Sequence, residues 1–290
     1  MLKNNLFIDF MQYIKFVIDG GSVYTNLDLI YKQLFLSKSA SCHISVLLAG
    51  GEHVGTSWCG LSLAHALNLE KQKVLLVDGN GNFSNISSYI LLQNPLYLDD
   101  YFYENKTLNQ LITAYKNKDF NILTAFPGHN YLDEQPLGRV HLFIDDLELL
   151  IPNYNQVLID VGSDVNEKIL SFCQVADNLI FILSEQNSEL VRIFDTINFM
   201  YKYGIKTKYN LIINKVNSFE DGYKIFKELY KATERKNLPT PNLLGIIRTD
   251  TRVRDTIKNK ELLLTRYPAS EAAIDIKNIA QKLVMEQNNE

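Results

Sequence analysis

The amino-acid sequence predicts an α/β fold with a doubly wound, mostly parallel sheet and helices on both faces. Two observations lead to this prediction. Seven short apolar runs alternate with helical patterns after residue 40, and such alternation is typical of βαβ units. Most runs are continuous Val/Ile/Leu stretches, as expected for parallel strands that are covered on both faces. The predicted strands are His43–Leu48, Lys73–Asp78, Asn121–Ala125, Gln156–Asp160, Asn178–Leu183, Asn210–Asn214 and Leu243–Ile247.

Helices are expected between these strands and after the last one. A helix that packs on a sheet carries apolar side chains three or four positions apart. The final predicted helix is Ile274–Met285, and the residues suited to its core face are Ile274, Ile276, Ile279, Ala280, Leu283 and Val284. The helices predicted between strands are Thr56–Leu69, Asn166–Cys173, Ser188–Tyr203 and Phe219–Thr233.

Residues 1–40 differ in pattern from the rest of the chain. The stretch LFIDFMQYIKFVIDGG is strongly apolar and aromatic and ends at a glycine pair. A second stretch, Asn26–Leu36, has apolar side chains on one helical stripe. We predict a helical N-terminal extension over 1–40 and a main domain over 41–290. The extension either packs on the sheet or serves as a docking or membrane-surface helix.

Composition excludes several classes of function. The formal net charge of −4 provides no overall basic field, so a nucleic-acid partner is not indicated. The three cysteines are scattered and lack metal-ligand spacing. No apolar run reaches the roughly 18–20 residues that a membrane span needs, and we find no signal peptide. We therefore expect a cytoplasmic protein.

A glycine-rich turn joins the first strand to the first helix. Gly50 and Gly55 have the spacing of the phosphate-loop pattern G-x-x-x-x-G-K-[ST], in which backbone N–H groups surround phosphates. Here Thr56 follows Gly55 directly, and no lysine or arginine occurs between His43 and Lys71. The scaffold of a nucleotide site is present, and the charge that would neutralise the β- and γ-phosphates is absent.

From about residue 43 to 285 the chain resembles the MinD/ParA superfamily of deviant Walker ATPases, and within it most closely the FlhG/FleN regulators of flagellar number. The resemblance implies a P-loop NTPase-like domain with ATP or ADP and magnesium as ligands, and an ATP-sandwiched dimer. Besides the glycine loop, it rests on VLLVDGNGNFSNI (74–86), YNQVLIDVGSD (154–164), YNLIINKV (209–216) and the long block over 243–283.

The family loop reads K-G-G-x-G-K-T-S, and neither of its lysines is matched. Aligned on Thr56-Ser57, the two lysine positions hold Gly50 and Gly55; aligned on Gly50-Gly51, the first holds Ala49 and the second is lost. Glu52 adds a negative charge that should repel phosphate. The residues that the resemblance still assigns to nucleotide binding are Gly50, Gly51, Gly55, Thr56, Ser57, Asn214 and Arg248.

Three residues match magnesium-type positions of the family. Asp78 corresponds to the first aspartate of its D-x-D motif, Asp160 to the Walker-B carboxylate, and Thr56 offers a hydroxyl ligand. Taken alone, an aspartate at the end of a strand is more often a turn or capping residue, and only the three positions together make a metal or nucleotide site equally plausible. Asn80 stands at the second D-x-D position, and a neutral amide cannot act as a general base. No residue is therefore assigned a catalytic role.

Two further residues match family positions near the nucleotide base. Asn214 ends the strand LIIN and corresponds to the asparagine that recognises adenine, although a turn-forming role would explain it equally. Arg248 lies in the segment Ile247-Arg248-Thr249, where relatives carry I-P-x-D. It is either a compensating positive charge or an ordinary surface arginine.

Together these departures favour a regulatory or scaffolding pseudo-ATPase of the FlhG/FleN type. We expect ATP, ADP and magnesium to bind weakly or not at all, and no ATP-dependent homodimer, because the charges that lock the dimer and drive turnover are missing. The expected partners are proteins of flagellar or polar assembly. Many relatives add a basic membrane helix after the last helix; this chain has only EQNNE there, so we expect no membrane attachment by that route.

Two alternatives remain open at this point. The first is a slow ATPase of the same family, in which Arg248, Lys215 or a lysine of a partner replaces the missing loop lysine. The second is an accessory factor of polysaccharide export or cellulose synthesis, processes in which MinD-like folds also serve.

Overall fold

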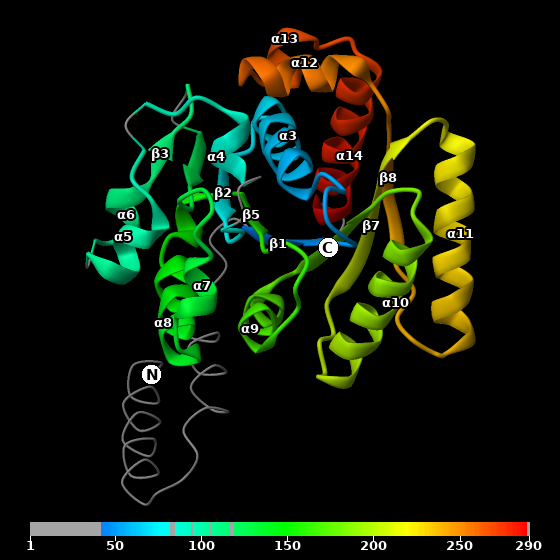
Figure 1. The fold of residues 1–290 in the computed structure, drawn as a ribbon, viewed down its shortest axis with the longest axis horizontal. Coiled ribbons are helices and arrows are strands. Elements are labelled where there is room, and N and C mark those ends of the chain that lie inside the picture. The colour runs from blue at the N-terminus through cyan, green and yellow to red at the C-terminus, as the bar shows by residue number, and fades with distance from the viewer. Residues whose placement is uncertain (1–41, 82–84, 94, 105, 117–118, 289–290) are drawn as a thin grey trace, which may run out of the picture. The chain divides into compact units, whose positions relative to one another are not determined.

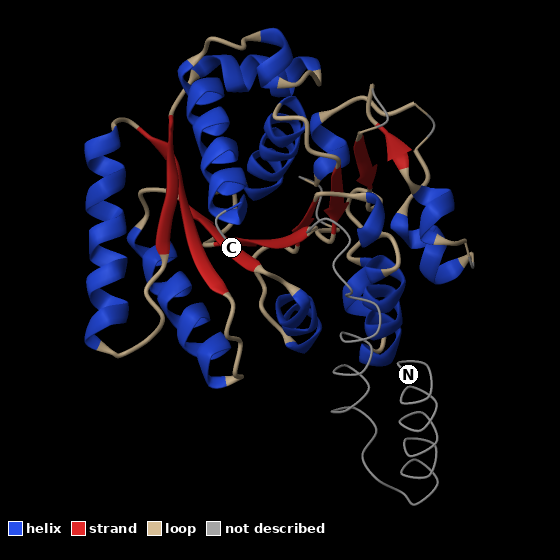
Figure 2. Cartoon of the chain, turned by 180° about the vertical axis from the view of Figure 1, so that it is seen from behind, coloured by secondary structure: helices blue, strands red, loops and turns tan. Residues whose placement is uncertain are grey.

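The strands of the computed structural model form one sheet, seen in Figures 1 and 2. The structure describes residues 42–81, 85–93, 95–104, 106–116 and 119–288. The sheet has the order β3-β4-β2-β5-β1-β6-β7-β8, and all its pairs are parallel except β3 with β4. The strands are β1 (His43–Ala49), β2 (Val74–Asp78), β3 (Thr113–Ala114), β4 (Phe120–Leu123), β5 (Gln156–Asp160), β6 (Asn178–Leu183), β7 (Lys208–Val216) and β8 (Asn242–Arg248).

This sheet confirms the predicted fold class. All seven predicted strands are present, and their ends agree within two residues. The strand that the sequence did not reveal is β3, which has two residues and runs antiparallel to β4. A two-residue strand is too short to show any hydrophobic period. The predicted helical extension over 1–40 lies outside the described residues, so it stays a prediction.

Helices cover both faces of the sheet, and a separate apolar core fills each interface. In Figure 1, α3 and α14 lie on one side of the strands, and α9 and α10 lie on the other. The first face has α3 (Thr56–Leu69), α4 (Ile86–Tyr89), α12 (Thr251–Asn259), α13 (Leu263–Arg266) and α14 (Glu271–Asn288). The second has α5 (Leu98–Tyr103), α6 (Leu108–Leu111), α7 (Tyr131–Glu134), α8 (Leu137–Glu148), α9 (Glu167–Val175), α10 (Asn187–Lys202) and α11 (Phe219–Arg235). Within the described part of the chain, none of these helices combines the length and the apolar character that a bilayer span requires.

The prediction for the last helix was wrong at one position and short at both ends. Ile274 was expected in the core, but its residue is 44% exposed, whereas Ile276 and Ile279 are buried. Two residues along a helix turn the side chain to the opposite side, so Ile274 and Ile276 cannot share a face. Helix α8 was not predicted, although Val140, Phe143, Ile144 and Leu147 recur at helical spacing and are buried.

The order of the strands reverses at β1. Strands β2 to β5 lie on one side of β1 in the sheet, and β6, β7 and β8 lie on its other side. Because these strands are parallel, the carboxyl ends of β1, β2, β5 and β7 all lie at the same end of the sheet. In open α/β sheets such a reversal of strand order leaves a crevice for ligands at that edge.

Candidate nucleotide-binding site

The glycine loop between β1 and α3 has the backbone that its sequence predicts. The N–H of Gly50 donates to the carbonyl oxygen of Ile182 at 2.7 Å, so the loop starts against β6. Gly55 has a φ of 92°, and a Cβ added there would stand 2.8 Å from Nδ2 of Asn214. Any other residue at position 55 would have an unfavourable φ and a side chain too close to Asn214, so this position requires glycine.

The loop leaves a row of backbone donors open. The N–H groups of residues 52–57 donate to no acceptor in the described part of the chain. They precede and begin α3, a helix of 14 residues, so the positive end of its dipole lies at the same place. Open N–H groups at a helix N-terminus are suited to bind an anion such as phosphate.

The first turn of α3 places two hydroxyl groups differently. Oγ of Ser57 donates to Oδ2 of Asp160 at 2.5 Å. Oγ1 of Thr56 is buried and has no hydrogen-bond partner. The sequence assigned the hydroxyl ligand of a metal to Thr56, whereas the structure brings Ser57 to the aspartate. With Gly50 and Gly55 at their pattern spacing, Thr56 then occupies the lysine position and Ser57 the [ST] position.

Two fully buried carboxylates lie beside this turn. Asp78 and Asp160 end the neighbouring strands β2 and β5 and are paired in register. Oδ2 of Asp78 accepts from the N–H of Ile86 at 3.1 Å, while its Oδ1 has no hydrogen-bond partner. Oδ1 of Asp160 accepts from the N–H of Gly162 at 3.2 Å.

The environment of this pair opposes negative charge. Burial raises the pKa of Asp160 to about 6, against the lowering effect of the hydrogen bond from Ser57. Burial and the nearby Asp160 raise the pKa of Asp78 well above its usual range. A divalent cation would relieve this cost, since oxygen ligands and an open carboxylate oxygen fit magnesium. In the described part of the chain, no three His, Cys, Asp or Glu side chains are grouped to hold a metal ion.

Asn80 follows Asp78 in the turn after β2. A Cβ added to Gly162 would stand 3.3 Å from Cγ of Asn80, so the amide lies against the turn after β5. Its backbone N–H is among the groups that stabilise the charged form of Asp78. This position holds a neutral amide beside the buried carboxylate pair.

Two residues at the end of β7 hold the glycine loop. Nδ2 of Asn214 donates to the carbonyl oxygen of Val54 at 2.8 Å, and this asparagine is buried. Nζ of the next residue, Lys215, donates to the carbonyl oxygen of His53. Both His53 and Lys215 have positive φ angles, of 59° and 61°. The contact was not apparent from the sequence, because the two segments are 162 residues apart.

Arg248 is engaged in ion pairs with α14. Its Nε and Nη2 donate to Asp275 at 3.1 and 3.0 Å, and its Nη1 donates to Glu271 at 2.8 Å. Its guanidinium also lies 4.6 Å from the ring centre of Phe219. Asp275 is buried, so Arg248 neutralises a carboxylate of the fold. The structure does not join this arginine to the glycine loop.

A second buried acid behind the loop was not anticipated. Glu189, in the first turn of α10, is 3% exposed and accepts hydrogen bonds from the backbone N–H and the hydroxyl of Ser184. A Cβ added to Gly51 would stand 3.2 Å from its Cγ. A glutamate near a helix start is usually exposed, so the sequence contained no signal for this position.

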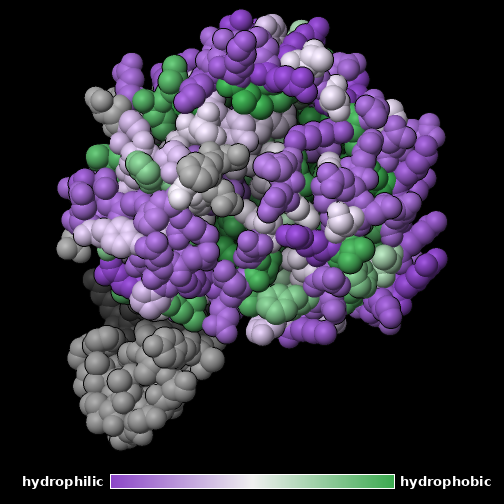
Figure 3. All heavy atoms as spheres, viewed as in Figure 1, coloured by the Kyte–Doolittle hydropathy of each residue, from purple (hydrophilic) through white to green (hydrophobic). Residues whose placement is uncertain are grey.

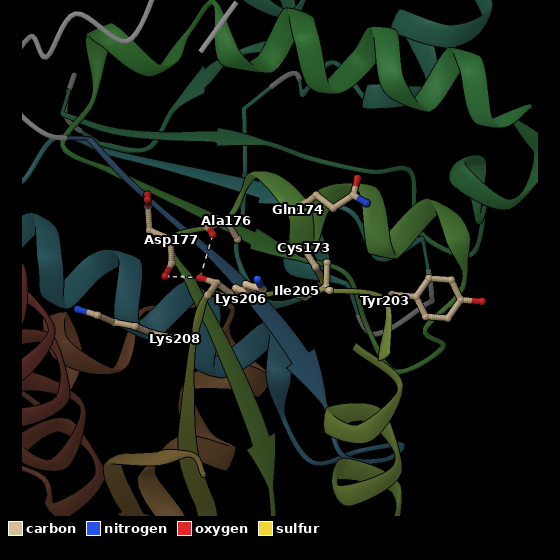
Figure 4. A pocket seen from close by; sticks show the side chains of 10 residues that line it. Cys173, Gln174, Ala176, Asp177, Tyr203, Ile205, Lys206 and Lys208 are labelled. Atoms are coloured by element: carbon tan, nitrogen blue, oxygen red, sulfur yellow. Dashed lines mark hydrogen bonds between the residues drawn. The ribbon is translucent and has the colours of Figure 1, made fainter. Parts of the chain in front are cut away.

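A separate depression lies at the opposite edge of the sheet, shown in Figure 4. Its volume is about 460 Å³, and its lining includes Asp177, Lys206 and Lys208 at the amino ends of β6 and β7. The hydroxyl of Thr207 donates there to the carbonyl oxygens of Ala176 and Asp177 at 2.9 and 2.5 Å. None of the predicted site residues lines it.

Comparisons with known proteins agree with this architecture. No family model matches the chain. The antiactivator FleN of Pseudomonas aeruginosa is 20% identical over 242 residues, which cover 82% of this chain and 85% of FleN.

Solved structures of the same fold cover most of the chain. The septum site-determining protein MinD from Pyrococcus horikoshii, solved with Mg-ADP, has a TM-score of 0.71 at 17% identity and covers 86% of this chain and 98% of its own. A ParA family ATPase from Chlorobium tepidum has a TM-score of 0.67 at 15% identity and covers 84% of this chain and all of its own. The chain therefore has the fold of these MinD and ParA family ATPases, and its sequence is similar to that of the antiactivator FleN over most of its length.

Proposed function

We propose that this protein is a regulatory or scaffolding member of the FlhG/FleN group that acts in the cytoplasm through protein partners of flagellar or polar assembly and does not turn over ATP. The observation that carries the proposal is Thr56 in the lysine position of an otherwise well-formed loop. The similarity to an antiactivator supports a role in control rather than in metabolism.

The charges around the site support weak nucleotide binding. The loop has no cation of its own, and Asp78, Asp160 and Glu189 are all buried close to it. Ser57, Asp160 and Asp78 would hold magnesium, which would supply positive charge to offset that of a phosphate. Without the loop lysine, binding rests on backbone N–H groups and on the helix dipole, which contributes roughly 0.3–2 kcal/mol.

A surface beside the site supports a protein partner. A shallow groove of about 530 Å³ runs between the turn after β5 and helix α10 and includes Val165, Val191 and Phe199. Val191 is 61% exposed. On the face shown in Figure 3, hydrophobic residues form separate groups among hydrophilic ones. Mixed surfaces of this kind are common at regulated, non-obligate interfaces.

The regulatory role is tested in the host organism. Deleting the gene should change the number or position of flagella, counted by electron microscopy. Complementation with the wild-type gene and with a Thr56→Ala, Asp160→Ala double variant should restore the count equally, because the proposed role does not depend on turnover. An unchanged count after deletion would contradict the flagellar role.

ATP hydrolysis should be at background. Asn80 cannot act as a general base, and the loop lacks its lysine. Purified protein with magnesium and ATP should release no more phosphate than the same double variant. Turnover clearly above this control would favour the slow-ATPase alternative, for which Lys215 beside the loop is the supporting observation.

Nucleotide should not cause dimerisation. No loop lysine is available to reach a nucleotide held by a second subunit. Light scattering should give the same mass with ADP and with a non-hydrolysable ATP analogue. A dimer formed only with the analogue would show that another residue bridges the two subunits.

A further inference from the structure

We propose that His129 is a pH-sensitive latch that joins helices α5 and α7 over the turn at residues 79–81, which follows β2. The latch is closed when the imidazole carries a proton and opens when the proton is lost. The inference goes beyond the proposed function, because it concerns a cluster of side chains outside the candidate nucleotide-binding site.

The imidazole of His129 bridges the two helices through both of its nitrogens. Its Nδ1 contacts Oδ1 of Asp99 in α5, and its Nε2 lies 3.1 Å from Oε1 of Glu134 in α7. Only the protonated ring carries a hydrogen on each nitrogen, so only this form donates to both carboxylates. A neutral ring donates to one of them and directs the lone pair of its other nitrogen at the second.

Other hydrogen bonds hold the two carboxylates in place. Oδ2 of Asp99 accepts from the backbone N–H of Phe126 at 3.0 Å. Oε2 of Glu134 accepts from the hydroxyl of Tyr103 at 2.6 Å, and the side chain of Gln135 donates to that hydroxyl at 3.1 Å. Neither carboxylate can turn away without breaking a second hydrogen bond. Loss of the proton therefore weakens the bridge between the helices.

The backbone beside this imidazole lies against the end of β2. A Cβ added to Gly81 would overlap the carbonyl group of His129, so the two segments are in direct contact. The hydroxyl of Tyr131, two residues further along the chain, donates to the carbonyl oxygen of Asp78 at 3.1 Å. The latch thus determines how firmly the segment around His129 is held on the turn after β2.

The titratable groups that contact His129 favour its protonated form. The hydrogen bond to Asp99 is the largest cause that raises the pKa of His129 above 6.5, and Glu134 adds to this effect, while burial opposes it. Conversely, the hydrogen bonds from Tyr103 and then from His129 lower the pKa of Glu134. The two directions agree, as expected for groups that stabilise each other's charged form.

The other charged groups of the surrounding elements have partners of their own. Asp100 of α5 pairs with Lys106, and Asp133 of α7 accepts from Asn130. The ammonium of Lys168, from α9, donates to backbone carbonyl oxygens of α7. The turn after β2 has no titratable side chain. In the described part of the chain, no lysine or arginine competes with His129 for its two carboxylates.

The direction of the pKa shift determines how the latch responds to pH. Because folding raises the pKa of His129, the folded protein keeps this proton to a higher pH than the unfolded chain does. The stabilisation is complete below about pH 6.5 and is lost as the pH rises through the folded-state pKa. We therefore expect the segment around His129 to open more often in mildly alkaline solution than in mildly acidic solution.

The experiment compares His129 with a histidine that faces no carboxylate. His129→Gln removes the titration, and His141→Gln is the matched control, because His141 is half-buried and pairs with the hydroxyl of Ser171 at 3.0 Å. Hydrogen exchange of the full-length protein, corrected for the intrinsic rate at each pH, gives the opening of residues 97–104 and 126–135. An NMR titration of the histidine side chains gives the pKa of His129, whose signal is absent from His129→Gln.

In the wild-type protein, the opening of both segments should increase about tenfold from pH 6 to pH 9, the effect of losing one charge-assisted hydrogen bond. His141→Gln should behave in the same way. In His129→Gln the opening should be high and independent of pH. Glu134→Gln removes one of the two carboxylates, so it should lower the pKa of His129 and move the increase to a lower pH.

Several results would overturn the inference. A pKa of His129 at or below 6.5 would do so, and so would an opening of the wild type that does not change with pH. The same increase in wild type and in His129→Gln would assign the effect to another group. An equal increase in β6 and β7 would show that the whole domain opens rather than this segment.

Discussion

The candidate site has two halves that differ in how they hold charge. The metal half consists of Ser57, Asp78 and Asp160, which are buried, polar and close together. The phosphate half consists of the loop over 50–56, which has the backbone of an anion site and no cation of its own. Its nearest ammonium group, that of Lys215, comes from another strand.

The two halves differ in how strongly the fold fixes their functional groups. The two aspartates end strands whose other residues fill the core, so strand pairing alone determines where their carboxylates lie. The charge of a phosphate loop depends on the identity of one residue, here Thr56, at the start of α3. The loop backbone, in contrast, is held by its glycines and by Asn214.

The largest expected effect concerns Arg248, which we place in neither half. Arg248→Ala removes the guanidinium from the buried carboxylate of Asp275 and leaves it only the backbone N–H of residue 248, and loss of such a charged partner costs about 3 kcal/mol of unfolding free energy. Urea denaturation measures this loss. Arg252→Ala is the control, because Arg252 is half exposed and 3.9 Å from Asp250, so it should cost less than about 1 kcal/mol.

Equal costs in the two variants would contradict this structural role of Arg248. A selective loss of ATP affinity in Arg248→Ala, at unchanged stability, would return this arginine to the phosphate half. The phosphate half would then have a cation, contrary to our description of it.

The second prediction concerns the charge in the metal half. The folded state raises the pKa of Asp160 from 3.8 to about 6, so the folded protein binds the extra proton and stability falls as pH rises between these values. The loss is about 3 kcal/mol. Asp160→Asn lacks this titration but can still accept from Ser57, so its stability relative to wild type should rise by that amount from pH 4 to pH 7.5.

The measurement is urea denaturation in EDTA at a series of pH values. The difference between the two proteins reports on Asp160 together with the neighbouring Asp78, whose pKa Asp160 raises, and cancels distant titrating groups such as His65, whose pKa burial lowers to about 4. A difference that stays flat with pH would mean that the carboxylate is not held in a charge-opposing environment. Added magnesium should stabilise the wild type more than the variant.

The third prediction concerns a variant that restores the positive charge of the phosphate half. Thr56→Lys places a lysine directly after Gly55, at the pattern position, and should tighten ATP binding by about tenfold or more. Trp58, the only tryptophan, lies in the same turn and reports binding through its fluorescence. In the wild-type protein, the fluorescence of Trp58 should change only near millimolar ATP or not at all.

Thr56→Met is the matched control, with a side chain of similar reach and no charge. Tighter binding in both variants would show that the size of the side chain, rather than its charge, limits the site. A saturable wild-type response at micromolar ATP would show that the phosphate half already has an effective cation.

The sequence determined the fold class because its signals are local. Continuous Val/Ile/Leu runs marked seven of the eight strands, and the strand–glycine–helix order marked the loop. The buried face of each helix was harder to predict, because it depends on which element packs against the helix. Ile274, predicted in the core and found exposed, is an example. The missing lysine and the retained aspartates were also visible, because each is an identity at a position.

Only the tertiary structure decided which groups meet. Ser57 rather than Thr56 reaches Asp160 across 103 residues of sequence, and Lys215 reaches His53 across 162. Arg248 became part of an ion-pair network because α14 passes beside the end of β8. Such contacts depend on the packing of distant elements, and a side chain near the end of a strand can point to several neighbours. The sequence alone specifies the residue, and the packed sheet specifies its partner.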